Sequence, residues 1–211
     1  MSLRGDEMNK TIYIVLTKTK TVLSKAIQIY TQHDFNHVSI SFDAELKEMY
    51  SFGRKNINNP WIGGFVHENP SSTLLRESNC VIFACPVTEH QYAILKNRIA
   101  YYKQNKNEYK YNFIGLFGVA CRVKIKRERA FFCSQFIATL FEEADLPLYG
   151  KCPYFMKPYD FVHLPYLTFV YKGKVENFIG YCSEEKQKKK RLASIHAFAL
   201  SAIYMGRNKV S

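Results

Sequence analysis

The stretch Phe131-Phe132-Cys133-Ser134-Gln135-Phe136-Ile137-Ala138 decides most of what this sequence predicts. Its apolar residues recur at helical spacing, which predicts a helix over residues 133–144 with Cys133 in its first turn. The first amides of a helix lack partners within it, and together with the helix dipole they stabilise a thiolate and can bind an oxyanion. Cys133 is therefore a candidate nucleophile, although a lone buried cysteine is more often a small apolar core residue.

A histidine nearly a hundred residues earlier supplies a candidate base. The run His37-Val38-Ser39-Ile40-Ser41-Phe42 alternates, which predicts a strand with Val38, Ile40 and Phe42 on one face and His37 with the two serines on the other. A polar face that begins with histidine at a strand terminus is typical of a strand lining a cleft. The ordinary alternative is a histidine at the surface or satisfied within the core.

A third polar residue should orient the imidazole if this pair is catalytic. A hairpin turning over residues 43–45 would pair Phe42 with Leu46 and Val38 with Tyr50, so that His37 faces Ser51. A register slip of one residue would instead bring Glu48 and Tyr50 to the imidazole face. Ser51 is the first choice, and Glu48 and Tyr50 stay open as alternatives.

Composition limits the class of protein. The 211 residues carry a net charge of +12, which favours acidic partners. No zinc-finger spacing, RNA-binding signature or phosphate loop accompanies the lysines, so we expect no specific nucleic-acid site. The six cysteines form no Cys-x-x-Cys pair, and the six histidines show no ligand spacing, so we expect reduced thiols, no metal and no cofactor.

The remaining pattern predicts an α+β fold whose sheet is mainly antiparallel, because helices and strands alternate without βαβ regularity. Beyond the strands beginning at His37 and Glu48, we expect strands over 11–17 and 80–86 and a hairpin formed by 167–171 and 174–178. Residues 53–79 are predicted to be a long surface excursion with one short strand at 64–66. Further helices are expected over 21–33, 88–105, 112–121 and 183–205.

Three segments follow from this pattern. Residues 1–9 are expected to be a disordered or added N-terminal segment, residues 10–182 the catalytic domain, and residues 183–211 a basic, amphipathic C-terminal helix. The last could make weak contact with an anionic membrane surface, but a helix packed on the domain is the simpler interpretation. With no signal peptide or membrane span in the sequence, a cytoplasmic location is expected.

The histidine strand, the hairpin into Met49-Tyr50-Ser51-Phe52-Gly53 and the Phe132-Cys133-Ser134-Gln135-Phe136 segment together resemble one known family. The sequence is similar to the circularly permuted branch of the NlpC-type papain-like cysteine hydrolases, which includes YiiX-like and YycO-like bacterial proteins and, distantly, the lecithin retinol acyltransferases. In papain and ordinary NlpC enzymes the cysteine helix comes first, so the order here matches the permuted branch. The chain departs from that pattern in having Ser39 where glycine is usual.

The resemblance implies a permuted papain-like fold and a cysteine hydrolase that cleaves an amide through an acyl-enzyme. It assigns Cys133 as nucleophile, His37 as general base and Ser51 roughly as the third member, and it makes Tyr111 the nearest match to an oxyanion-binding tyrosine. Ser134, beside the nucleophile, is expected to contribute to substrate binding. The implied substrate is a small amide or peptide, such as an isopeptide in a cell-wall fragment. The alternatives are an acyltransferase or thioesterase acting on lipids, or a catalytically silent protein that binds a ligand or a membrane.

Overall fold

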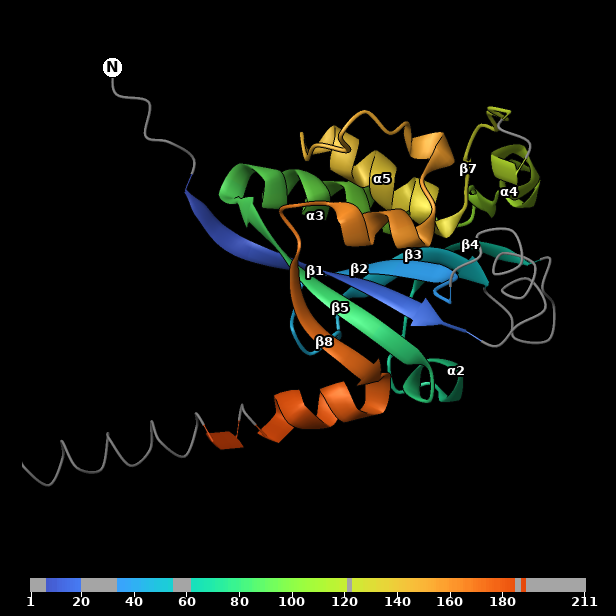
Figure 1. Cartoon of the computed structure of the whole chain (residues 1–211). Helices are drawn as coiled ribbons and strands as arrows, with labels where there is room; N and C mark the ends of the chain where they lie inside the picture. The colour runs from blue at the N-terminus through green and yellow to red at the C-terminus, as the bar shows by residue number, and fades with distance from the viewer. Residues whose placement is uncertain (1–6, 20–33, 55–61, 121–122, 185–186, 189–211) are drawn as a thin grey trace, which may run out of the picture.

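A computed structural model describes residues 7–19, 34–54, 62–120, 123–184 and 187–188. Its main element is a six-stranded sheet in the order β4-β3-β2-β1-β5-β8, in which every neighbouring pair is antiparallel (Figure 1). The strands are β1 (Met8–Lys18), β2 (His37–Ser41), β3 (Met49–Arg54), β4 (Gly63–His67), β5 (Asn79–Thr88) and β8 (Thr168–Lys174). The predicted α+β class with a mainly antiparallel sheet is confirmed.

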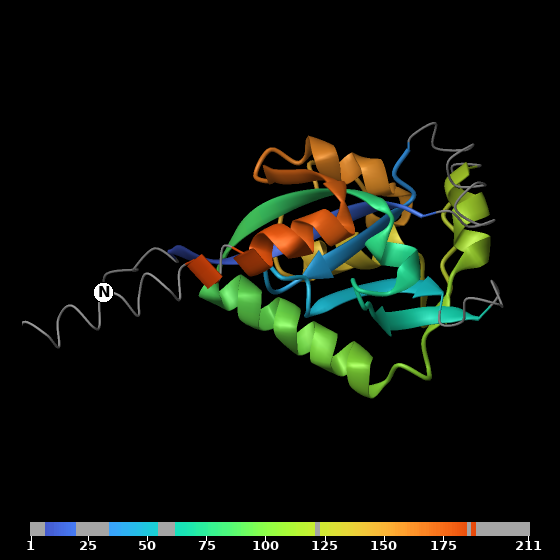
Figure 2. The same ribbon diagram turned by 90° about the horizontal axis from the view of Figure 1, so that it is seen from below.

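Helices cover both faces of this sheet. The helix α3 (Glu89–Gln104) and the cysteine-bearing α5 (Cys133–Glu143) lie on one face, whereas α2 (Thr73–Arg76) and a helix over residues 175–184 lie on the other (Figures 1 and 2). Strand alternation divides the apolar side chains accordingly. Ile14, Ile40 and Phe52 belong to the larger core under α3 and α5, and Val15 and Met49 belong to the smaller core on the other face.

Local sequence explains why α3 forms where it does. Thr88 accepts a hydrogen bond from the Gln91 amide at 3.1 Å, and the Gln91 side chain accepts one from the Thr88 amide at 3.0 Å. This reciprocal capping satisfies two amides that the helix itself leaves unpaired. Leu95, Ile99 and Tyr102 then recur on one buried face. The helix predicted over residues 88–105 is therefore confirmed.

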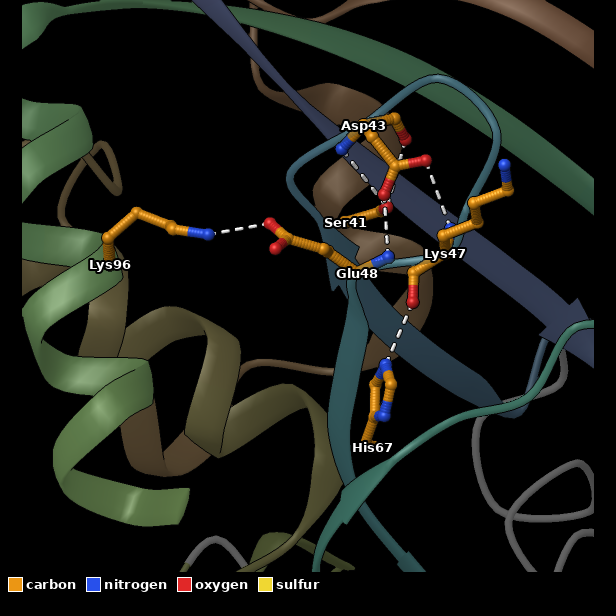
Figure 3. Close-up of polar contacts among 6 residues, drawn as sticks. All are labelled: Ser41, Asp43, Lys47, Glu48, His67 and Lys96. Atoms are coloured by element: carbon orange, nitrogen blue, oxygen red, sulfur yellow. Dashed lines mark hydrogen bonds and ion pairs between the residues drawn. The ribbon is translucent and has the colours of Figure 1, made fainter. Parts of the chain in front are cut away.

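The connection between β2 and β3 is wider than the predicted three-residue turn. The carboxylate of Asp43 accepts hydrogen bonds from the amides of Lys47 at 3.0 Å and Glu48 at 2.6 Å, which holds a loop rather than a tight turn (Figure 3). Within the loop Leu46 has a φ of 59° and is fully buried. The observed register pairs Ile40 with Tyr50, so it differs from the prediction by two residues. An even shift preserves the faces, because side chains alternate with a period of two.

Several other predicted elements need correction. The strand predicted to end at Pro86 continues to Thr88. Pro86 has no amide hydrogen to donate, but it lies beyond residues 79–84, the part of β5 that pairs with β8. The late hairpin is wrong: β8 is followed by a helix, because Val175 and Phe178 bury one helical face in the smaller core. The helix predicted over 21–33 and most of the one over 183–205 lie outside the described residues.

Two described elements lie across the predicted segment boundaries. β1 begins at Met8, which pairs with Thr88, so the last residues of the segment 1–9 belong to a strand. The helix over residues 175–184 crosses the boundary predicted at 182/183. Among the described helices, none is both long and apolar enough to cross a membrane.

A small second sheet was not predicted. It consists of β6 (Lys110–Tyr111) and β7 (Ala130–Phe131), which pair in parallel, with α4 (Phe113–Ala120) in the connection between them. Two residues per strand are too few for a periodic signal, so the pairing could not be recognised from the sequence. The pairing matters for the site because it holds Tyr111 beside Phe131, two residues before Cys133.

Candidate active site

The cysteine predicted as a nucleophile opens α5, as expected. Cys133 is 1% exposed, and the residue at the N-cap position before it is Phe132, which provides no side-chain cap. Natural helices favour Ser, Thr, Asp or Asn at this position, and an apolar residue there forgoes about 1 kcal/mol of capping. The side chain at the N-cap position therefore accepts no hydrogen bond from the first amides of α5, which lie next to the thiol.

The predicted base reaches this thiol. α5 packs across β2 and β3, and His37 is the first residue of β2. The side chain of Cys133 lies close enough to the imidazole to raise the pKa of His37. The structure therefore brings together the two residues that the sequence singled out, although 96 positions separate them.

The partner that orients the imidazole is Glu68, which sequence reasoning missed. Its Oε1 atom lies 2.6 Å from Nε2 of His37. Because Nε2 faces the carboxylate, Nδ1 is the ring nitrogen left for the sulfur. The side chains are 15% exposed for His37 and 7% for Glu68, so the pair is largely shielded from water.

Strand pairing accounts for the position of Glu68. It follows β4 directly, and its amide donates to the Met49 carbonyl at 2.8 Å, which extends the β3–β4 ladder by one step. Ser51 pairs with Val66, two residues earlier, so Glu68 and Ser51 point to the same face. The short strand predicted at residues 64–66 was correct. The sequence did not predict that this strand pairs with β3, and that pairing is what places Glu68 near His37.

The three residues considered for the third position have other contacts. Ser51 is fully buried, and its hydroxyl donates to the Glu68 carboxylate, so it supports the partner of His37 instead of contacting the imidazole itself. Glu48 forms an ion pair with Lys96 at 2.6 Å, beside the loop between β2 and β3 (Figure 3). Tyr50 lies on the core face and stacks on His67 and Phe65. The even register shift kept Ser51 on the correct face but moved it along the strand.

Opposing effects act on the ionisation of the buried pair. Burial lowers the pKa of His37, but the Glu68 carboxylate and Cys133 outweigh burial and raise this pKa to about 10. Burial likewise raises the pKa of Glu68, yet the imidazolium and hydrogen bonds from His37, Ser51 and Ser39 hold it below its ordinary value. Both shifts favour the charged forms, so imidazolium and carboxylate coexist at neutral pH.

Tyr111 lies where an oxyanion-binding residue would be needed. Tyr111 is 5% exposed, and its hydroxyl lies close enough to the side chain and the backbone of Cys133 to interact with both. Burial, together with the charge of Cys133, raises the pKa of Tyr111 well above 10. The phenol therefore stays protonated and can donate a hydrogen bond.

Ser134, the other predicted substrate-binding residue, has a structural contact instead. Its hydroxyl is buried and donates to the carbonyl of Met156 at 2.6 Å, which fastens the segment around η1 (Pro153–Phe155) to α5. Only its backbone amide remains near the thiol. Within the described ranges, no three His, Cys, Asp or Glu side chains gather in a way that could hold a metal ion.

Comparisons with known proteins add no assignment to this geometry. No protein-family model matches the chain, and no curated protein is significantly similar to it. The site must therefore be interpreted from its own residues.

Proposed function

We propose that this protein is a cysteine hydrolase that cleaves amides through a Cys133–His37–Glu68 triad, on a permuted papain-like fold. The observation that carries the proposal is the 2.6 Å contact between Nε2 of His37 and Glu68, on an imidazole that also interacts with Cys133 at the start of α5. Covalent catalysis by a thiol requires a nucleophile, a base in contact with it, and a third group that orients the base. Cys133, His37 and Glu68 are arranged in that order.

The ionisation of the site indicates how the steps would be divided. A positive charge on the imidazole favours the thiolate form of a neighbouring sulfur, which is the form that attacks a carbonyl carbon. The sulfur attacks the carbonyl carbon, and the amide of Cys133 with the Tyr111 hydroxyl stabilises the oxyanion. His37 then donates its proton to the leaving amine as the C–N bond breaks, which leaves a thioester. His37 next takes a proton from water, and the resulting hydroxide releases the acid and restores the thiolate.

The substrate class proposed is a small amide or peptide, including the isopeptides of cell-wall fragments. The resemblance of the sequence to permuted NlpC-type hydrolases supports this choice. Transfer of the acyl group to an acceptor other than water would use the same thioester. Acyl transfer is therefore distinguished by its product, not by the residues involved.

The test is an activity screen of amide and ester substrates with wild-type protein and the Cys133→Ala variant, with and without an added amine acceptor. We expect amide hydrolysis by wild type and none by Cys133→Ala. Cys152→Ala is the matched control, because Cys152 is partly buried in a loop and should leave activity unchanged. Equal activity of wild type and Cys133→Ala on the same substrate would refute the triad.

A further inference from the structure

One stretch of the chain beside the site is unusually basic. Residues 103–120 and 123–129 carry seven cations and two acids, a net +5 out of +12 for the whole sequence. All nine of these side chains are exposed, and the ion pair between Arg129 and Glu108 cancels one charge of each sign. The cations are Lys103, Lys106, Lys110, Lys124, Lys126, Arg127 and Arg129.

Aliphatic side chains are exposed among these cations. Ile114 on α4 is 51% exposed, and Val123 just beyond it is 54% exposed. The Val123 amide donates to the Gly118 carbonyl at 2.8 Å, which holds the segment 123–125 against the helix. Gly118 permits this approach, since a Cβ there would meet the Val123 oxygen at 2.6 Å and Ile125 at 2.9 Å. Ile114 lies one helical turn before Gly118, so both aliphatic residues belong to one surface.

This α4 surface, defined by Ile114 and residues 123–127, is connected to the candidate site at both ends. α4 begins two residues after Tyr111, and the segment 123–129 leads through β7 into Cys133. The amide of Asn112 donates to the Phe131 carbonyl at 2.9 Å, which fastens the two ends together. Whatever binds the α4 surface is therefore brought close to the thiol.

We propose that the α4 surface docks on an anionic lipid bilayer. Clustered lysines and arginines are attracted to acidic headgroups, and each contributes roughly a fivefold gain in binding near such a surface. A soluble polyanion would satisfy the charges equally well, but it gives no reason for two aliphatic residues to be exposed among them. A bilayer does, because it offers apolar depth beneath its charged headgroups. This inference does not depend on the proposed hydrolase activity.

The experiment is co-sedimentation of the full chain with vesicles of phosphatidylcholine alone and of equimolar phosphatidylcholine and phosphatidylglycerol. We expect binding to the anionic vesicles only, weakened by added salt. Lys126→Glu/Arg127→Glu should lower the partition coefficient at least about tenfold. The matched control is Lys172→Glu/Lys174→Glu, which makes the same charge change on β8, far from α4 in Figure 1. The control should bind like wild type.

A second variant separates a bilayer from a soluble polyanion. Ile114→Ser/Val123→Ser keeps every charge, so it should weaken binding to anionic vesicles severalfold while leaving binding to soluble polyphosphate unchanged. Vesicle binding equal to wild type by this variant, or by Lys126→Glu/Arg127→Glu, would overturn the proposal. Cys133→Ala should bind vesicles like wild type, so failure of the hydrolase proposal and failure of this one are distinguishable.

Discussion

Nε2 of His37, in β2, lies 2.6 Å from Oε1 of Glu68, which directly follows β4, although β2 and β4 do not pair with each other. β3 lies between them and contributes the hydroxyl of Ser51, which also donates to Glu68. Three neighbouring strands therefore hold one ionised pair. Loss of either charge would leave the other buried without a partner, which typically costs about 3–5 kcal/mol.

Glu68→Gln should lower the pKa of His37. The amide can still accept a hydrogen bond, but it removes the charge that opposes the desolvation of the imidazolium, so the pKa should fall from about 10 towards or below the ordinary 6.5. NMR titration of the imidazole measures this directly. Glu48→Gln is the control, because Glu48 pairs with Lys96 instead. An unchanged His37 titration in Glu68→Gln would contradict the assigned role of Glu68.

The pair should also make folding stability depend on pH. The pKa of His37 is raised from 6.5 to about 10, so its contribution is complete below pH 6.5 and is lost as the pH rises through 10. The pKa of Glu68 is lowered from 4.5, so its contribution is present above pH 4.5 and is lost as the pH falls through the lowered value. Both contributions are therefore complete between pH 4.5 and 6.5.

Urea unfolding of wild type and of His37→Gln/Glu68→Gln over this range tests that dependence. The free energy of unfolding of wild type should exceed that of the variant by the largest amount between pH 4.5 and 6.5. This difference should become smaller at lower and at higher pH. Parallel stability curves for the two proteins would show that the pair is not ionised.

Tyr111→Phe should reduce turnover without preventing alkylation of the thiol. Removing one oxyanion donor typically costs about a hundredfold to a thousandfold in rate. Alkylation develops no oxyanion, so its rate should change much less than the turnover rate. Tyr109→Phe is the control, since Tyr109 is also buried but its ring packs against Tyr102 and Phe131. Equal turnover by wild type and Tyr111→Phe would remove Tyr111 from the mechanism.

Gly63→Ala should displace Tyr111 and destabilise the fold. A Cβ at Gly63 would lie 2.7 Å from Cβ of Tyr111 and 2.9 Å from the Gly53 oxygen, which is closer than atoms can pack. Overpacking of this kind costs about 1–3 kcal/mol. Gly180→Ala is the control because it faces open space in a helix, where alanine should be neutral or stabilising. Thermal unfolding compares the two variants, and equal stability would contradict the close packing of β4 against Tyr111.

Patterns within single elements were predictable here, and pairings between elements were much less so. The helical spacing after Cys133 and the alternation after His37 are local, so both elements and their polar and apolar faces were predicted correctly. The register of β2 with β3 depended on Asp43 capping a loop through its side chain and on the positive φ of Leu46. Neither has a periodic signature in the sequence.

Glu68 was missed for a related reason. It lies in a stretch rich in Gly, Asn, Pro and Ser, which predicts a surface excursion. Its position in the site depends on the pairing of β4 with β3, which the composition of this stretch does not predict. The role of Tyr111 was expected from the family resemblance alone, whereas the parallel pairing of β6 with β7 is what holds it beside Phe131, two residues before Cys133.

In the proposed mechanism Cys133 is the nucleophile and His37 activates it. This pairing is tested by the rate of iodoacetamide alkylation of Cys133 at pH 7, with the modified residue located by mass spectrometry, in wild type and in His37→Ala. Burial raises the pKa of Cys80 and Cys85 to about 12, so those two thiols serve as unreactive internal references. We predict rapid alkylation of wild-type Cys133 and a loss of this reactivity in His37→Ala. An alkylation rate of Cys133 that is unchanged by His37→Ala would contradict the proposed mechanism.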